Sequence, residues 1–90
     1  MSRNIIYSDS RLKLINGTDH AIGMFFQIYD KKMENETPEQ EGLVLDWSEL
    51  FGFEINLTGM PNSENVIGII NKYITDNGDS KNKLMLIEKL

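Results

Sequence analysis

The chain contains no cysteine, so neither disulfide bonds nor thiolate metal ligands can contribute to its stability. It has one histidine, and its seven glycines are dispersed without the spacing of a phosphate-binding loop. A Ser-based nucleophile elbow is also missing. We therefore predict no catalytic residues, no metal and no cofactor.

Long apolar runs and an excess of basic residues are missing too. No apolar run approaches the length of a membrane span, and the opening stretch MSRNIIYSDSR lacks the apolar segment of a signal peptide. The formal net charge of −5 disfavours nucleic-acid binding and adsorption to anionic membranes, because both need a basic surface. These absences predict an acidic cytoplasmic protein that binds neither nucleic acid nor membranes directly.

The length of 90 residues suits one domain, so residues 1–90 are predicted to form a single small globular domain. A chain of this size buries only about 60–65% of the surface that it exposes when unfolded. The expected free energy of unfolding is roughly 4–13 kcal/mol. Stability must therefore come from one hydrophobic core or from self-association.

The densest run of large apolar residues is AIGMFFQIYD, residues 21–30. A strand here would place alternate residues on one apolar face, namely Ile22, Met24, Phe26 and Ile28. A helix over 21–33 would instead align Ile22, Phe25, Phe26, Tyr29 and Met33. The aromatic and β-branched composition favours the strand, and the helix remains the alternative.

Short apolar or alternating segments predict further strands at residues 4–7, 11–15, 43–46 and 53–57. The last is the clearest, because strict alternation directs Phe53, Ile55 and Leu57 inward. The closing segment 84–88 suits either a buried strand or a short helix.

The segments between the predicted strands contain residues that favour turns and loops. The pair Asn16-Gly17 suits the positive φ angles of a tight hairpin turn. Residues 31–42 predict a long solvated loop, because they are polar and contain Pro38 and Gly42. The glutamates of this segment lack the ligand spacing of a calcium site. Ser48 is expected to cap one turn of helix that Gly52 ends.

One helix is predicted over residues 63–76, capped by Asn62 or Ser63, with Gly78 as a left-handed C-terminal stop. Its apolar stripe contains Val66, Ile67, Ile70, Tyr73 and Ile74. The predicted fold is therefore α+β, an antiparallel sheet of four to six strands with this helix covering one face, in two layers.

The bulky residues of 21–30 exceed what one helix can cover. If this segment is a strand, Phe25 and Tyr29 lie on its second face and stay exposed unless the opening or closing segment covers them. Exposed apolar groups mark contact surfaces, and Trp47 is either a plug of the core or a further anchor. We expect a non-enzymatic protein-interaction domain that self-associates as a homodimer through these three residues.

Two other functions remain open. A ligand-binding protein or enzyme would centre on His20, a residue type that can act as a general acid or base, with Asp19 or Asp46 as its carboxylate. An acidic decoy of nucleic acid would use the net negative charge to occupy a basic partner.

Overall fold

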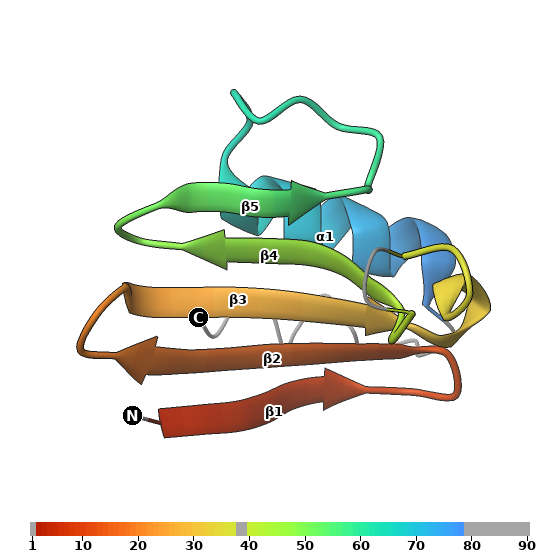
Figure 1. Ribbon diagram of the computed structural model, residues 1–90. Coiled ribbons are helices and arrows are strands. Elements are labelled where there is room, and N and C mark those ends of the chain that lie inside the picture. Colours follow the sequence, from red (N-terminus) through yellow and green to blue (C-terminus); the bar gives the residue numbers. More distant parts are fainter. Residues whose placement is uncertain (1, 38–39, 79–90) are drawn as a thin grey trace.

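Residues 2–37 and 40–78 are described by the computed structural model, which has an α+β fold. The elements are β1 (Ser2–Ser8), β2 (Leu12–Asp19), β3 (Gly23–Asp30), η1 (Lys31–Met33), β4 (Leu43–Ser48), β5 (Gly52–Asn56) and α1 (Val66–Asn77). The strands form one antiparallel five-stranded sheet in chain order, and α1 lies behind it in Figure 1. Within residues 2–37 and 40–78, one covering helix and two layers confirm the predicted fold class.

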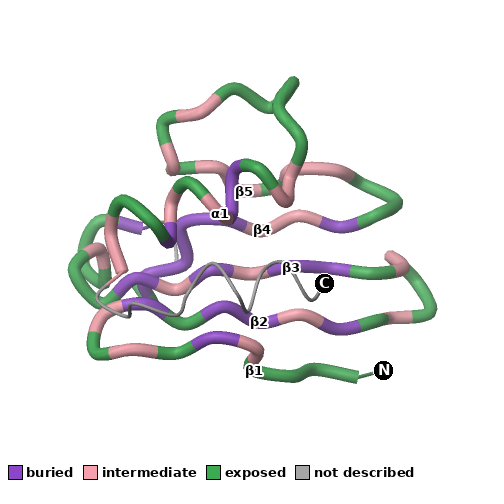
Figure 2. The backbone as a smooth tube through the Cα atoms, turned by 180° about the vertical axis from the view of Figure 1, so that it is seen from behind, coloured by how far each residue is buried: buried purple, intermediate pink, exposed green. Residues whose placement is uncertain are grey.

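The core lies between α1 and the sheet. Ile69, Ile70 and Ile74 of α1 are fully buried. They belong to one cluster with Leu12, Leu14, Phe26, Ile28, Val44 and Leu45 of the sheet. Burying one such side chain stabilises the fold by roughly 1.5–3 kcal/mol, so this apolar contact helps to hold α1 against the sheet. Figure 2 shows the buried positions along the central strands, whereas the first half of β1 is exposed.

The segment 21–30 contains a strand, and its predicted phase is confirmed. Phe26 and Ile28 of β3 face the core, whereas Met24 on the same side is 39% exposed near the end of the sheet. The alternative helix over 21–33 does not form, because every residue of β3 is paired with β2 in the sheet.

The hairpin turn predicted at Asn16-Gly17 is wrong, because β2 continues through both residues to Asp19. The turn lies at residues 20–22 instead. Gly17 is opposite Phe25 of β3, and a Cβ atom on Gly17 would lie 2.7 Å from the Phe25 ring. Glycine is needed here for the space that the ring fills, not for a turn.

Phe25 is buried on the sheet face away from α1. It is 4% exposed and its neighbour on that face, Ile15, is 3% exposed. Arg3 of β1 donates a hydrogen bond of 2.6 Å to Gln27 of β3. By the strand register this bond crosses β2 between Ile15 and Gly17, over the apolar row. Exposure of Phe25, one of the two alternatives that the sequence leaves open, is therefore wrong.

The connection between β4 and β5 is a tight turn at residues 49–51, so the predicted helical turn is wrong. Ser48 does cap this turn, since its Oγ accepts a hydrogen bond of 3.2 Å from the Phe51 N–H. Gly52 opens β5 with φ of 68°, a left-handed conformation that favours glycine.

Of the three residues predicted to face inward in β5, only Phe53 packs against the core. A register shift between Asp46 and Trp47 places Phe53 opposite Trp47 but Ile55 opposite Asp46, on the other face. Leu57 lies beyond the end of β5 and is 44% exposed. A β-bulge thus breaks the alternation that the sequence indicates.

Helix α1 begins later than predicted, because Asn65 rather than Asn62 or Ser63 caps it. The Asn65 side chain accepts hydrogen bonds of 2.8 and 3.4 Å from two backbone N–H groups of the first turn. The predicted apolar stripe faces the core. Gly78 follows the helix with φ of −78°, so the predicted left-handed stop is wrong. Gly78 is instead crowded, since a Cβ atom there would lie 2.8 Å from the Ile74 carbonyl oxygen.

The polar segment after β3 forms η1 and a further turn at 34–36, as expected of a loop. Thr37 Oγ1 accepts a hydrogen bond of 3.0 Å from the Gly42 N–H. The segment 84–88, for which the sequence allows strand or helix, lies outside the described residues. In the part of the chain that the structure describes, no helix combines the length and apolarity needed to cross a membrane.

Candidate functional site

Two hairpin turns lie side by side at one end of the sheet, the β2–β3 turn (20–22) and the β4–β5 turn (49–51). The Leu50 N–H donates a hydrogen bond of 3.1 Å to the Ile22 carbonyl. The Glu49 N–H donates to the Met24 carbonyl (2.8 Å), and Glu49 Oε1 accepts from the Met24 N–H (3.1 Å). These bonds hold the two turns in a fixed relation.

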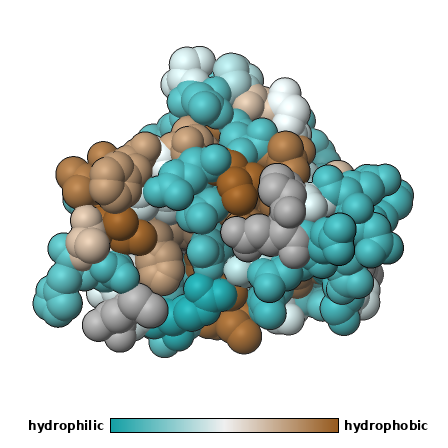
Figure 3. All heavy atoms as spheres, viewed as in Figure 1, coloured by the Kyte–Doolittle hydropathy of each residue, from teal (hydrophilic) through white to brown (hydrophobic). Residues whose placement is uncertain are grey.

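Large apolar side chains project from this fixed end. Leu50 is 66% exposed and Phe51 is 61% exposed, although turns usually carry small or polar residues. Met24 is 39% exposed, and Ile22 is half-buried. We call these four residues the hairpin-end patch, and Figure 3 shows hydrophobic side chains gathered at this end of the sheet, on the left. The patch exposes on the order of 300 Å², a size that is often functional on a small protein.

An open hollow of about 350 Å³ lies between the two turns. Its lining consists of His20, Ala21, Ile22, Gly23, Glu49 and Leu50. Leu50 thus belongs both to the exposed patch and to the wall of the hollow. The hollow is large enough to receive an apolar side chain from another molecule.

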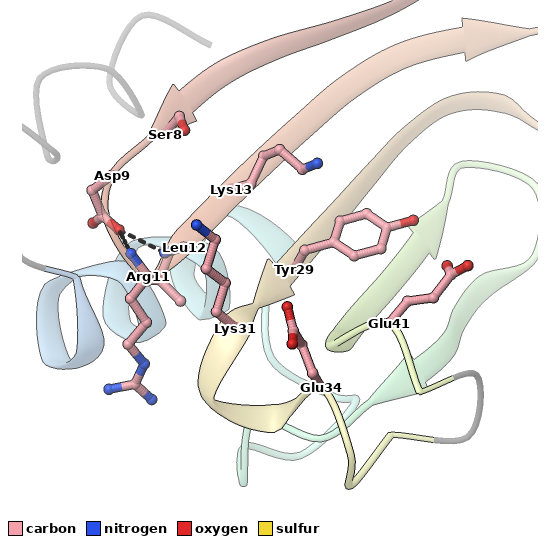
Figure 4. Close-up of a pocket in the computed structure, with 9 residues that line it drawn as sticks. All are labelled: Ser8, Asp9, Arg11, Leu12, Lys13, Tyr29, Lys31, Glu34 and Glu41. Atoms are coloured by element: carbon pink, nitrogen blue, oxygen red, sulfur yellow. Dashed lines mark hydrogen bonds between the residues drawn. The ribbon is translucent and has the colours of Figure 1, made fainter.

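A second hollow, of about 300 Å³, lies at the opposite end of the sheet on the face away from α1 (Figure 4). Among its lining residues are Lys13, Tyr29, Lys31, Glu34 and Glu41. We call it the charged hollow. The Lys13 ammonium lies 5.2 Å from the centroid of the Tyr29 ring, in a cation–π contact.

Asp30 forms a buried polar cluster between the sheet and α1, with a fully buried side chain. Its carboxylate accepts two hydrogen bonds of 2.8 Å from the Arg11 guanidinium and one of 2.6 Å from the Tyr73 hydroxyl. The backbone N–H of Lys32 donates a further bond of 3.0 Å. Arg11 precedes β2, Asp30 ends β3 and Tyr73 belongs to α1, so the carboxylate joins three segments.

The electrostatics of this cluster keep Asp30 charged. Burial raises the pKa of the Asp30 carboxyl, but hydrogen bonds from Arg11 and Tyr73 outweigh burial and lower the pKa below its ordinary value. Burial and the hydrogen bond to Asp30 raise the pKa of the Tyr73 hydroxyl. The hydrogen bond to Asp30 also raises the pKa of Arg11. Because these groups satisfy one another, we interpret the cluster as a structural tie.

The cluster predicts a loss of stability at both extremes of pH. The lowered pKa of Asp30 stabilises the fold above the unfolded value of about 3.9, and this contribution disappears as pH falls through the folded pKa. The raised pKa of Tyr73 stabilises the fold below about pH 10 and is lost as pH rises further. Urea unfolding across pH checks both effects. Asp30→Asn should flatten the acid limb and Tyr73→Phe the alkaline limb, and unchanged limbs would contradict this assignment.

The structure does not bring Phe25, Tyr29 and Trp47 to one exposed surface. Phe25 is buried over Gly17, and Tyr29 is half-buried on the same face of the sheet. Trp47 lies on the opposite, core-facing side, where its ring is 5.9 Å from that of Phe26. The three residues of the predicted interface therefore do not share one surface of the monomer.

Asp19, His20 and Asp46 are not brought together either. Asp19 Oδ1 accepts a hydrogen bond of 2.7 Å from the Ala21 N–H, and His20 is exposed in the same turn. Asp46 is opposite Gln27 of β3, about 13 Å along the strand from the turn at roughly 3.3 Å per residue. Within residues 2–37 and 40–78, no three His, Asp or Glu side chains are close enough to hold a metal ion.

Sequence reasoning missed Leu50, Phe51 and the Asp30 cluster. The sequence predicted a turn of helix for the segment that contains Leu50 and Phe51, and such a turn does not indicate that they are exposed. The structure instead places them at the tip of a hairpin. The burial of Asp30 could have been predicted, because alternation along β3 places it on the inward face with Phe26 and Ile28. An inward carboxylate indicates a buried cationic or hydroxyl partner.

Comparisons of the chain with known protein families, with curated proteins and with solved structures found no match.

Proposed function

We propose that the protein is a small interaction domain that self-associates through the hairpin-end patch. The observation that supports this proposal is the exposure of Leu50 and Phe51 beside a hollow on the same end of the sheet. A projecting group next to a receptive hollow suits a two-fold contact, in which Phe51 of each copy enters the hollow of the other. Burial of these apolar groups supplies the driving force.

The size and charge of the protein set the strength of this contact. The patch of on the order of 300 Å² is smaller than the roughly 800 Å² per partner that stable complexes bury, so the dimer should be weak and concentration-dependent. The net charge of −5 makes two copies repel each other. Salt screens this repulsion, so added salt should strengthen the association.

Phe51→Ser is expected to weaken self-association at least tenfold, on the order of the loss seen for interface anchors. Sedimentation velocity over a wide concentration range, at low and high salt, measures the change. The substitution lies in an exposed turn, so the unfolding midpoint should stay near that of the wild type.

Ile5→Ser is the matched control, because Ile5 on β1 is exposed to the same extent as Phe51, 61% for each. This variant should associate as the wild type does. Equal losses in both variants would indicate nonspecific hydrophobic contact, and a loss in Ile5→Ser alone would place the contact at the β1 edge. A wild-type protein that stays monomeric at high concentration and high salt would refute the proposal.

A further inference from the structure

Charged side chains of both signs face the charged hollow without neutralising one another. Lys13 and Lys31 supply two cations, and Glu34 and Glu41 supply two anions, all around the Tyr29 ring (Figure 4). Among the ion pairs found within residues 2–37 and 40–78, none includes any of these four charged groups. Two cations and two anions therefore face the hollow without an ion-pair partner among the described residues.

The other charged residues of the lining are already engaged. Asp9 Oδ1 accepts hydrogen bonds from the backbone N–H groups of Arg11 (2.8 Å) and Leu12 (2.6 Å), and Asp9 Oδ2 accepts one from the Tyr7 hydroxyl. The Arg11 guanidinium binds Asp30 and points away from the hollow in Figure 4. The hollow therefore offers two charges of each sign and favours a ligand that carries both a carboxylate and a cationic group.

The floor and one wall of the hollow are fixed by the sheet. Tyr29 is paired with Lys13 of β2 on one side and with Leu43 of β4 on the other. The backbone N–H of Lys31 donates a hydrogen bond of 3.0 Å to the Arg11 carbonyl. The ring and the two lysines thus start from well-defined backbone positions, which reduces the entropy lost when a ligand is bound.

We infer that the charged hollow binds a small zwitterion of the amino-acid class, with a carboxylate and a separate cationic group. The carboxylate lies between Lys13 and Lys31, and the cationic group lies between Glu34 and Glu41. The volume of about 300 Å³ suits one amino acid, at the lower end of ligand pockets. A guanidinium is the best cation for two carboxylates, because it donates in a planar fork. The site is separate from the hairpin-end patch.

The test is a titration of the ¹⁵N-labelled protein with L-arginine at constant ionic strength, followed by amide chemical shifts. We expect saturable shifts around the charged hollow, with a dissociation constant on the order of 1 mM for a ligand of this size. Agmatine lacks the carboxylate and acetate lacks the cation, so each should bind at least about tenfold more weakly. An arginine inside a peptide resembles agmatine, because it presents a guanidinium without a free carboxylate. Weak binding of agmatine would therefore exclude a peptide arginine as the ligand and favour the free amino acid.

Charge-neutral variants locate the site. Lys31→Gln and Glu34→Gln should each weaken L-arginine binding at least about fivefold. Lys32→Gln and Glu36→Gln are the matched controls, because these exposed neighbours do not line the hollow, and they should bind as the wild type does.

Non-saturating shifts, equal binding of agmatine or acetate, or equal losses in the control variants would overturn the inference. Phe51→Ser should keep full L-arginine binding, so failure of the self-association proposal and failure of this inference are distinguishable.

Discussion

Asp30→Ala is expected to destabilise the fold by about 3–5 kcal/mol, a large part of the roughly 4–13 kcal/mol available to a domain of this size. The substitution leaves the Arg11 guanidinium and the Tyr73 hydroxyl without the carboxylate that binds both. It also removes the acceptor of the Lys32 N–H at the start of η1. Urea unfolding followed by the fluorescence of Trp47 measures the loss.

Asp76→Ala is the matched control. Asp76 also forms an ion pair, with Lys72 at 3.1 Å, but its side chain is 53% exposed. Solvent screens such a pair, so its removal should change stability by less than about 1 kcal/mol. If Asp30→Ala were no more destabilising than Asp76→Ala, the Asp30 cluster would not hold α1 to the sheet.

The parts of the fold that depend only on the spacing of apolar residues along the chain were predictable from the sequence. The alternation of Phe26 and Ile28 gave the phase of β3, because successive side chains of a strand point to opposite faces. The stripe containing Ile70 and Ile74 likewise gave the buried face of α1. At these positions the period of the apolar residues indicates the buried face correctly, because it can be read without knowing which distant segments pack there.

The remaining features depend on contacts between distant segments. The Asp30 carboxylate meets Arg11, 19 residues away, and Tyr73, 43 residues away. The turn that carries Leu50 is shaped by a hydrogen bond to Ile22 of another hairpin. No local pattern specifies these partners, so the candidate surface at Leu50 and Phe51 became visible only in the structure.

The Asn16-Gly17 pair is typical of a hairpin turn, but the structure gives Gly17 another role. Asn-Gly pairs are frequent in hairpin turns because glycine tolerates positive φ. In this sheet Gly17 lies inside β2, opposite Phe25, where the missing side chain leaves room for the ring. Packing of an aromatic ring over a glycine on the neighbouring strand is a known way to stabilise such a position.

Gly17→Ala is accordingly expected to destabilise the fold by about 2–3 kcal/mol through overpacking. The added Cβ would lie 2.0 Å from the Ser2 carbonyl oxygen of β1 and 2.7 Å from the Phe25 ring. The edge strand must therefore move away, and the ring must leave its place over β2. Urea unfolding measures the loss, and Gly68→Ala is the control. Gly68 lies inside α1 with nothing within 4 Å, so alanine there should stabilise by about 0.5–1 kcal/mol.

A double-mutant cycle separates the two explanations of Gly17. If the Phe25 ring causes the strain, the free energy of unfolding lost through Gly17→Ala should be about 1 kcal/mol smaller in a Phe25→Leu background than in the wild type. The reason is that the flexible leucine side chain can move away from the added Cβ atom. If Gly17 instead served a turn with positive φ, the loss would be the same in both backgrounds, since residue 25 has no part in that strain. Additive losses would therefore mean that the Phe25 ring does not cause the strain, and they would leave the Ser2 carbonyl oxygen, 2.0 Å from the added Cβ, as its cause.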